Sequence, residues 1–213
     1  MKDKKIKKIP YGVANYERVV QKNYYYVDKT MYLRTIEESG DYLFFIRPRR
    51  FGKSLFLSVM EAYYDVFYKD RFEEFFKGTW IYDHPTAERG KYLVLSLNFS
   101  AVEPDPGKME TSFSNHVRGE AVYFIQKYND FLSTNKKMTY YSNTIEESSS
   151  APDILTNLLL LCKGAQQELY VLIDEYDNFA NTILSTVGAE AYWDRMVRVF
   201  SDLFLENTGQ AKI

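Results

Sequence analysis

The sequence predicts an α/β domain in which a mostly parallel sheet carries helices on both faces. Three observations predict this fold: short apolar runs alternate with helical periodicities, Gly52-Lys53-Ser54 follows the first run, and Asp174 and Glu175 follow the last. Strands that alternate with helices form right-handed crossovers, and such crossovers build parallel sheets.

The composition excludes several classes of protein. Of the 213 residues, 46% are hydrophobic and 17% aromatic, so the chain has ample apolar surface to bury and is not disordered as a whole. The 27 basic and 29 acidic residues give a net charge of -2, which argues against a surface built throughout for polyanions. No apolar run approaches the roughly 18 residues that a membrane-spanning helix needs, and we see no signal peptide. We expect a cytoplasmic protein with no membrane partner.

Cysteine and histidine are too scarce to suggest disulfides or a zinc site. Cys162 is the single cysteine, and neither His84 nor His116 has cysteine partners at zinc-ligand spacing. We expect all three to be structural or solvent-facing, in a reducing compartment.

Residues 1–8 form a basic tail with five lysines. We interpret it as a solvated, frayed terminus in preference to a contact with a phosphate backbone. The expected domain covers 9–213, and its first helix is predicted to be capped by Asp28 or Thr30 and to end near Gly40.

The next segment predicts the first buried strand. Residues 42–46 form a continuous apolar run of five, too short for a helix and typical of a strand covered on both faces. A helix is predicted to follow from about Lys53 to Tyr68, with Phe67 on its apolar stripe.

The remaining elements alternate in the same way. Strands are predicted at 92–99 and 169–173, and helices at 109–132, 152–164 and about 189–206. Residues 133–151 are rich in Ser, Thr and Asn, and we interpret them as an exposed insertion. The long helix is predicted to bury a face made of Met109, Phe113, Val117, Ala121, Phe124, Tyr128 and Leu132.

Gly52, Lys53 and Ser54 lie where a buried strand is predicted to meet a helix. In that arrangement, backbone N–H groups and the positive helix end surround a phosphate. Lys53 would reach the β- and γ-phosphates, the Ser54 hydroxyl would ligate Mg²⁺, and Gly52 would let the backbone approach closely. The general pattern has glycine where this chain has Arg47, so Pro48 must shape the start of the loop.

Asp174 and Glu175 supply the second half of the expected site. They follow a buried run at the carboxyl end of a strand, where open α/β sheets bind ligands. Asp174 is the expected Mg²⁺ partner, directly or through water, and Glu175 would polarise the attacking water. An acid directly after the metal-binding Asp favours a hydrolytic NTPase over a nucleotide kinase.

Three segments resemble the bacterial AAA-ATPase-like family: Tyr-Tyr-Tyr-Val-Asp-Lys-Thr at 24–30, Phe-Ile-Arg-Pro-Arg-Arg-Phe-Gly-Lys-Ser at 45–54, and Val-Leu-Ile-Asp-Glu-Tyr-Asp-Asn at 171–178. The resemblance implies a P-loop NTPase fold, three layers α/β/α, of the additional-strand catalytic-glutamate class, with ATP preferred to GTP. Arg47 fits this family's pattern. Longer members carry a PD-(D/E)XK nuclease-like domain after the ATPase, so such a domain or a partner protein is an expected partner.

The candidate site residues form three groups. Lys53 and Glu175 are the catalytic candidates, and Ser54 and Asp174 are the candidate Mg²⁺ ligands. The nucleotide is expected on Arg49, Arg50, Phe51, Gly52, Lys53, Ser54 and Leu55.

Several roles stay open. Arg49 and Arg50 have three alternative roles: they face a phosphate, they contact a neighbouring subunit, or they form a surface salt bridge. In the relatives that the resemblance implies, residues 28–30 (Asp28, Lys29 and Thr30) would line the nucleotide base or brace the phosphate loop. A helix cap explains Asp28 equally well. Asp177 and Asn178 are expected to shape the turn after the acidic strand.

The resemblance also implies a further strand between the phosphate-loop strand and the acidic strand. Ala211, Lys212 and Ile213 would be its first residues, so we expect the sheet to be incomplete at the C-terminus. Because unpaired backbone at the centre of a sheet is costly, we expect the chain to be the N-terminal part of a longer polypeptide.

The leading hypothesis is an ATP-binding, Mg²⁺-dependent ATPase domain that drives or gates an attached or partner module. The alternative is a nucleotide-responsive binding module that holds ATP without appreciable turnover. A third reading, control of a nuclease-like domain acting on nucleic acid, rests on the resemblance alone. Oligomer formation stays open.

Overall fold

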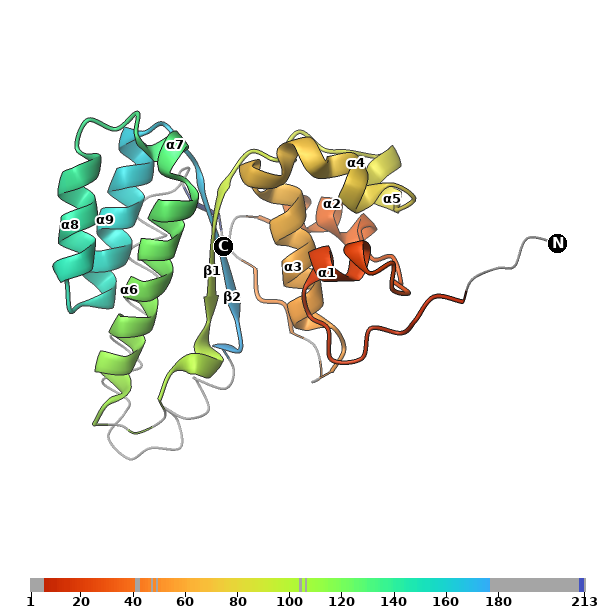
Figure 1. Ribbon diagram of the computed structural model, residues 1–213, viewed down its shortest axis with the longest axis horizontal. Coiled ribbons are helices and arrows are strands. Elements are labelled where there is room, and N and C mark those ends of the chain that lie inside the picture. Colours follow the sequence, from red (N-terminus) through yellow and green to blue (C-terminus); the bar gives the residue numbers. More distant parts are fainter. Residues whose placement is uncertain are drawn as a thin grey trace. The chain divides into compact units, whose positions relative to one another are not determined.

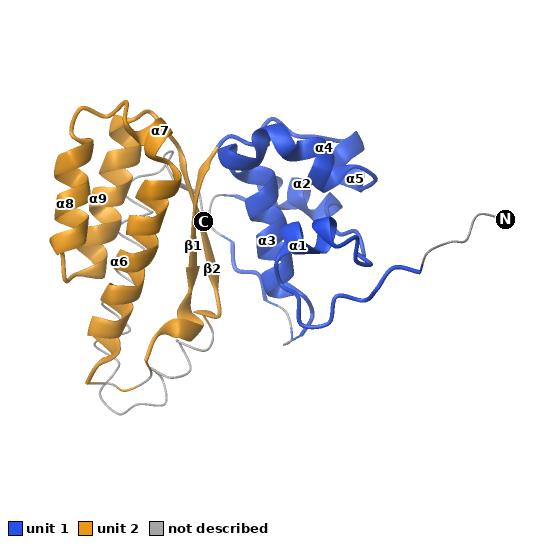
Figure 2. Ribbon diagram, in the orientation of Figure 1, with its two compact units in different colours: residues 1–91 blue, residues 92–213 orange. Residues whose placement is uncertain are grey.

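A computed structural model describes residues 6–40, 43–46, 48, 50–103, 105, 107–176 and 211–212. The chain divides into two compact units, residues 1–91 and residues 92–213 (Figure 2). Each unit has its own buried apolar side chains. Among the helices of the described residues, none is both long and apolar enough to cross a membrane.

The first unit is helical and has an aromatic core. Its elements are α1 (Tyr16–Gln21), α2 (Met31–Glu38), α3 (Lys53–Tyr64), the 3₁₀ helix η1 (Val66–Arg71), α4 (Phe72–Phe76) and α5 (Trp80–Asp83) (Figure 1). The rings of Tyr63 and Phe76 meet edge to face with centroids 5.5 Å apart, and Tyr16 tilts against Phe76 at 5.6 Å. These ring contacts join α1, α3 and α4, because each pair adds attraction beyond simple burial.

The predicted helix near residues 30–40 is confirmed. α2 follows Thr30 and ends before Ser39, and Gly40 has a φ of 115°, which ends the helix. Its buried residue is Leu33, whose carbonyl accepts a hydrogen bond from the Tyr64 hydroxyl at 3.3 Å. This bond ties α2 to α3.

The helix predicted from Lys53 to Tyr68 is shorter than expected. α3 ends at Tyr64 because Asp65 takes an extended backbone conformation, with φ -71° and ψ 126°. The buried Asp65 carboxylate then accepts the Phe67 N–H at 2.8 Å and starts η1. The predicted burial of Phe67 is therefore wrong, and its side chain is 54% exposed.

The predicted buried strand at 42–46 is also wrong for the four residues that the structure describes. Residues 43–46 have no strand conformation, and Phe44 and Ile46 are 81% and 82% exposed. A strand persists only where a neighbour takes up its N–H and C=O groups. The strand that the resemblance places beside this segment is described over Ala211–Lys212 alone, and among the described residues these two pair with Leu169 and Tyr170 and not with residues 43–46.

The second unit is a parallel sheet with helices packed on it. Its strands are β1 (Leu93–Asn98), β2 (Leu169–Asp174) and β3 (Ala211–Lys212), in the order β1-β2-β3. The register runs from Leu93 beside Leu169 to Asn98 beside Asp174. The other elements are the 3₁₀ helix η2 (Phe99–Ala101), α6 (Met109–Lys127), α7 (Asn129–Leu132), α8 (Met138–Glu147) and α9 (Ala151–Gly164).

The helices of the second unit follow the predicted periodicities. α6, α8 and α9 pack against one another on one side of the β1–β2 pair, and α6 contacts β1 (Figure 1). All seven residues of the predicted apolar face, from Met109 to Leu132, are buried. The helix predicted at 152–164 is α9, which Ser150 caps through a bond from the Asp153 N–H.

Residues 133–151 are not the simple exposed insertion that their composition suggested. They contain α8, which packs against α6 and α9 and buries Ile145 completely. Asn135 is buried as well, and its side chain donates to the Leu161 carbonyl at 3.0 Å. The polar composition of this segment did not reveal a helix, because few of the residues of α8 are buried.

The predicted start of a further strand is confirmed for two residues. Ala211 and Lys212 form β3, which runs parallel to β2 with Ala211 beside Leu169. The described residues therefore form a mixed helix and sheet structure with a small parallel sheet. The three complete layers that the resemblance implies are not seen within them. The helix predicted at 189–206, Asp177, Asn178 and Ile213 lie outside the described residues.

Candidate functional site

The first half of the candidate site is the start of α3. Gly52 is the N-cap residue and has a left-handed conformation, with φ 79° and ψ 28°. The first hydrogen bond of the helix runs from the Phe56 N–H to the Gly52 carbonyl at 3.0 Å. The N–H groups of a first turn have no carbonyl partners inside their helix, which makes a helix start a binding site for anions.

Two contacts fix the loop that leads into α3. The ring of Phe45 stacks on the ring of Phe56, with centroids 5.3 Å apart and planes at 26°. The Phe51 N–H donates to the Pro48 carbonyl at 3.3 Å, which closes a turn just before Gly52. Pro48 thus lies in the turn that leads into α3, where its backbone carbonyl is the acceptor.

Of the nucleotide-binding residues predicted from the sequence, the consecutive residues 50–55 lie at this turn and at the start of α3. Gly52 precedes α3, and Lys53, Ser54 and Leu55 form its first turn with half-buried side chains. Phe51 is 60% exposed beside them.

Of the three arginines in the loop, the structure describes Arg50. Arg50 has a φ of 67° and makes no ion pair with any residue that the structure describes, so the salt-bridge reading has no support there. Arg47 and Arg49 lie outside the described residues.

The second half of the candidate site is the carboxyl end of β2. Val171 and Leu172 are buried, and Asp174 ends the strand with a half-buried side chain. Glu175 has a φ of 57°, a conformation that residues other than glycine rarely adopt. Its N–H donates to the Asp174 Oδ1 atom at 2.9 Å. The acids of this half lie in the second unit, whereas α3 belongs to the first.

Asn98 is a polar residue at this end of the sheet that the sequence analysis missed. It ends β1 and pairs in register with Asp174, so both side chains belong to the same end of two adjacent parallel strands. Its Oδ1 atom accepts the Ser100 N–H at 2.9 Å. The signal in the sequence was a polar residue that closes a buried apolar run.

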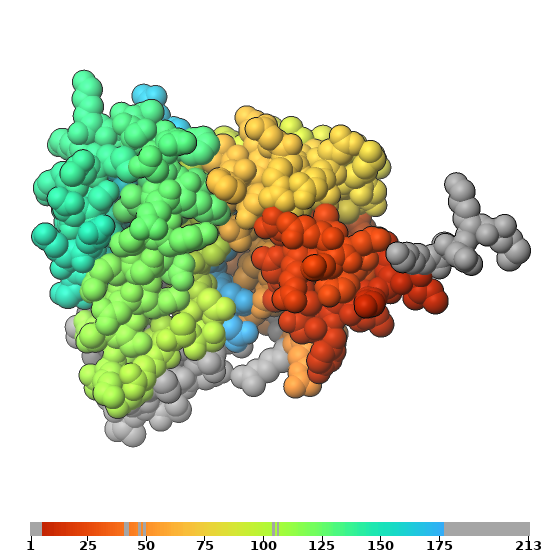
Figure 3. All heavy atoms as spheres, viewed as in Figure 1, coloured from red at the N-terminus to blue at the C-terminus, as the bar shows by residue number. Residues whose placement is uncertain are grey.

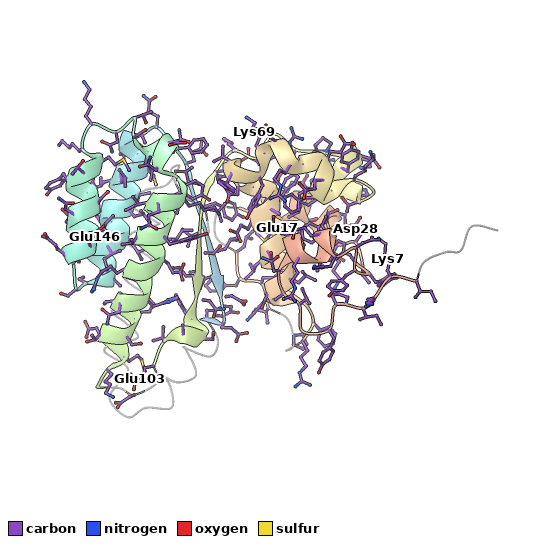
Figure 4. All side chains as sticks on the ribbon, viewed as in Figure 1. Lys7, Glu17, Asp28, Lys69, Glu103 and Glu146 are labelled. Atoms are coloured by element: carbon purple, nitrogen blue, oxygen red, sulfur yellow. The ribbon has the colours of Figure 1, made fainter. Side chains whose placement is uncertain are left out.

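The segment Tyr24–Thr30 serves a structural purpose that sequence spacing did not reveal. Asp28 accepts the Thr30 N–H through Oδ1 at 2.8 Å and the Trp80 N–H through Oδ2 at 2.6 Å. The buried Thr30 hydroxyl accepts the Ile81 N–H at 3.1 Å. The two side chains therefore cap α5, which lies about fifty residues further along the chain (Asp28 is labelled in Figure 4).

Two tyrosines near Asp28 remain protonated across the physiological range. Burial raises the pKa of Tyr26 well above its ordinary value of 10.0, and the charge of Asp28 raises it further. Burial also raises the pKa of Tyr16, whose hydroxyl donates to the Phe75 carbonyl at 2.9 Å. These phenols act as neutral packing groups.

A metal ion would have to share protein and ligand donors. In the described part of the chain, no three His, Cys, Asp or Glu side chains gather into a possible metal site. Mg²⁺ in phosphate-transfer sites is usually held by one or two protein oxygens together with phosphate oxygens and water. The Ser54 hydroxyl in the first unit and the Asp174 carboxylate in the second are each a hard oxygen donor of the kind that Mg²⁺ prefers.

Comparison with known proteins agrees with these features. A family model described as a predicted AAA-ATPase matches residues 10–212. The chain belongs to this AAA-ATPase-like family. An uncharacterised protein in the vnfD 5′ region of Azotobacter chroococcum mcd 1 is 29% identical over 172 residues. The aligned part covers 80% of this chain and 29% of that protein. No solved structure matches the chain.

Proposed function

We propose that this chain is the ATP-binding domain of a Mg²⁺-dependent ATPase whose hydrolysis drives or gates an attached or partner module. The observation that carries the proposal is the start of α3, where Gly52-Lys53-Ser54 forms the N-cap and first turn of a twelve-residue helix. The match to the AAA-ATPase-like family over residues 10–212 supports it.

Each residue at the start of α3 has a proposed part in holding the triphosphate. The backbone of Gly52 approaches the phosphate closely, because its left-handed conformation suits a residue without a Cβ atom. The Lys53 ammonium neutralises the β- and γ-phosphates, and Arg49, Arg50, Phe51 and Leu55 complete the surroundings.

The residues at the end of β2 have the proposed catalytic parts. Glu175 accepts a proton from the water that attacks the γ-phosphorus, while the bond from that phosphorus to the bridging oxygen of ADP breaks and ADP leaves. Ser54 and Asp174 would hold Mg²⁺, which would offset the charge of the phosphate oxygens. The proposal requires both halves of the site to meet on one nucleotide.

One contact favours the second candidate function, a nucleotide-responsive module that holds ATP without appreciable turnover. The Asp174 Oδ1 atom already accepts the Glu175 N–H, and Glu175 is held in a left-handed conformation. If the bond between the Glu175 N–H and Asp174 persists when nucleotide is bound, both residues would have to rearrange before hydrolysis. In this reading, ATP binding itself controls the partner, which we propose to be a nuclease-like domain or a separate protein.

The test is calorimetric titration of ATP with Mg²⁺ into the chain, followed by phosphate-release assays with and without DNA. Lys53→Ala should weaken ATP binding at least tenfold, whereas Lys77→Ala, which removes an exposed lysine paired with Glu73, should not. Equal ATP affinity in the two variants would refute the phosphate site.

Glu175→Gln separates the two candidate functions. We expect it to bind ATP normally and to release phosphate about 100-fold more slowly, because it keeps the shape of the side chain and removes the base. Normal turnover in this variant would show that Glu175 is not the base. Absence of turnover in the unmodified chain, with tight ATP binding, would favour the non-hydrolysing module.

A further inference from the structure

The two units carry opposite charge. Residues 1–91 contain 18 Lys and Arg against 13 Asp and Glu, a net charge of +5. Residues 92–213 contain 9 Lys and Arg against 16 Asp and Glu, a net charge of -7. The overall charge of -2 therefore conceals a basic unit, and a basic unit attracts polyanions.

The acidic groups near the start of this unit are already engaged. Between residues 6 and 32, the two acids are Glu17 and Asp28. Glu17 pairs with Arg71 at 2.7 Å, and both Asp28 oxygens accept backbone N–H groups. Within the described residues, neither carboxylate forms an ion pair with one of the lysines nearby.

Four lysines of the same stretch form no ion pair with any residue that the structure describes. Within the described residues, no acidic side chain lies within ion-pair distance of Lys7, Lys8, Lys22 or Lys29. Lys7, Lys8 and Lys22 are exposed, and Lys29 is half-buried. Figure 4 shows Lys7 on the segment that leads to the N-terminus of the first unit.

Tyrosines lie among these lysines because of one backbone hydrogen bond. The Tyr25 N–H donates to the Lys8 carbonyl at 2.8 Å, which places the first segment beside residues 24–26. Tyr26 turns inward and packs on Tyr16 with ring centroids 5.1 Å apart, so Tyr25 turns outward and is 56% exposed. Tyr32, whose N–H donates to the Lys29 carbonyl at 3.1 Å, is 46% exposed.

These residues form what we call the Lys–Tyr surface: Lys7, Lys8, Lys22, Tyr25, Lys29 and Tyr32. The stretch that contains these residues is red in Figure 3, where it covers part of the visible face of the first unit. Lysines interspersed with exposed aromatic rings suit a flexible chain that carries both phosphates and flat bases. An anionic membrane fits less well, because interfacial binding relies on a basic amphipathic helix and Lys7, Lys8, Lys22 and Lys29 lie outside helices.

We propose that the Lys–Tyr surface binds single-stranded nucleic acid, with the lysines on phosphates and bases stacked on Tyr25 and Tyr32. Since none of the six residues belongs to the proposed ATP site, this binding is separable from the ATPase proposal. Base stacking and phosphate contacts do not read sequence, so the binding should tolerate any sequence.

The first test measures fluorescence anisotropy of a fluorescein-labelled dT20 oligonucleotide with the full chain at about 50 mM salt. Lys7→Glu with Lys8→Glu should weaken binding at least tenfold and reduce the salt slope by about 1.4, at about 0.7 per lost phosphate contact. Lys136→Glu with Lys137→Glu makes the same change of net charge at two exposed lysines of the second unit and should have a much smaller effect.

The second test separates stacking from charge. Tyr25→Leu should weaken dT20 binding about fivefold or more with an unchanged salt slope, whereas Tyr140→Leu, at another exposed tyrosine, should not. ATP binding should be unaffected in both variants. The proposal is overturned by failure to bind dT20, by equal effects of the two lysine pairs, or by binding to vesicles with 30% phosphatidylserine but not to dT20.

Discussion

The Asp28 carboxylate accepts the backbone N–H of Trp80 at 2.6 Å, although 51 residues lie between them in the sequence. Together with the Thr30 hydroxyl on Ile81, this bond supplies the cap that α5 lacks from its own N-cap residue, Thr79. A segment that directly precedes α2 therefore holds α5, the last helix of the first unit.

Asp28→Ala should destabilise the first unit by about 1–3 kcal/mol, because it leaves two partly buried N–H groups without an acceptor. Asp28→Asn retains one acceptor oxygen and should lose less. Urea unfolding followed by tryptophan fluorescence measures both, since Trp80 lies at the affected bond. A loss for Asp28→Ala as small as that of the exposed Glu38→Ala would show that the cap does not matter.

Gly164 and Gly119 should respond in opposite directions to alanine. A Cβ atom at Gly164 would collide with the Asn135 side chain, which is buried and donates to the Leu161 carbonyl. Gly164→Ala should therefore cost about 1–3 kcal/mol. At Gly119, within α6, an added Cβ meets no atom within 4 Å, so Gly119→Ala should stabilise by about 0.5–1 kcal/mol. Chemical denaturation of both variants decides the matter, and the same sign of change in both would contradict this packing.

The Tyr128 hydroxyl protects the edge of β1. It accepts the Val94 N–H at 3.0 Å and donates to the Val94 carbonyl at 3.3 Å, on the side of β1 that faces away from β2. Tyr128→Phe should cost about 1–2 kcal/mol and speed hydrogen exchange of the Val94 amide. Tyr123→Phe, at an exposed tyrosine of α6, should change neither quantity. Unchanged exchange at Val94 in Tyr128→Phe would rule out edge protection.

Stability should fall with alkaline pH through Cys162. Burial raises the pKa of this thiol to about 12 from its ordinary value of 9.0. The unfolded chain therefore loses a proton above about pH 9 while the folded chain keeps it, and unfolding becomes easier by up to about 1.4 kcal/mol per pH unit. Urea unfolding between pH 8 and 10.5 under reducing conditions should show a shallower decline for Cys162→Ala. Parallel pH profiles would assign the decline to other groups.

Sequence patterns correctly predicted those helices and strands whose apolar residues repeat regularly within a single stretch of the chain. The face from Met109 to Leu132 is buried as expected, and the strand predicted at 169–173 is β2, which runs one residue further, to Asp174. α3 likewise starts at Lys53, the predicted residue. In each case the residues that decide the conformation are neighbours in the sequence, so periodicity and cap chemistry suffice.

The predictions that failed depended on distant partners. Residues 43–46 have the composition of a strand, but a strand needs a neighbouring backbone, and none pairs with them in the described chain. Composition also did not reveal that α8 would bury Ile145 against α6 and α9.

The sequence by itself determined the Gly52-Lys53-Ser54 motif at the start of α3, the acidic pair at the end of β2 and the positions of α2, α6 and α9. Tertiary structure decided that Asp28 and Thr30 cap α5, that Asn98 lies beside Asp174, and that Lys8 lies beside Tyr25. The physical reason is that a cap formed by the residue next to a helix, or an apolar stripe along one helix, depends on residues that lie close together in the sequence. A strand pairing or a cap between helices instead depends on which backbone groups the rest of the fold leaves open.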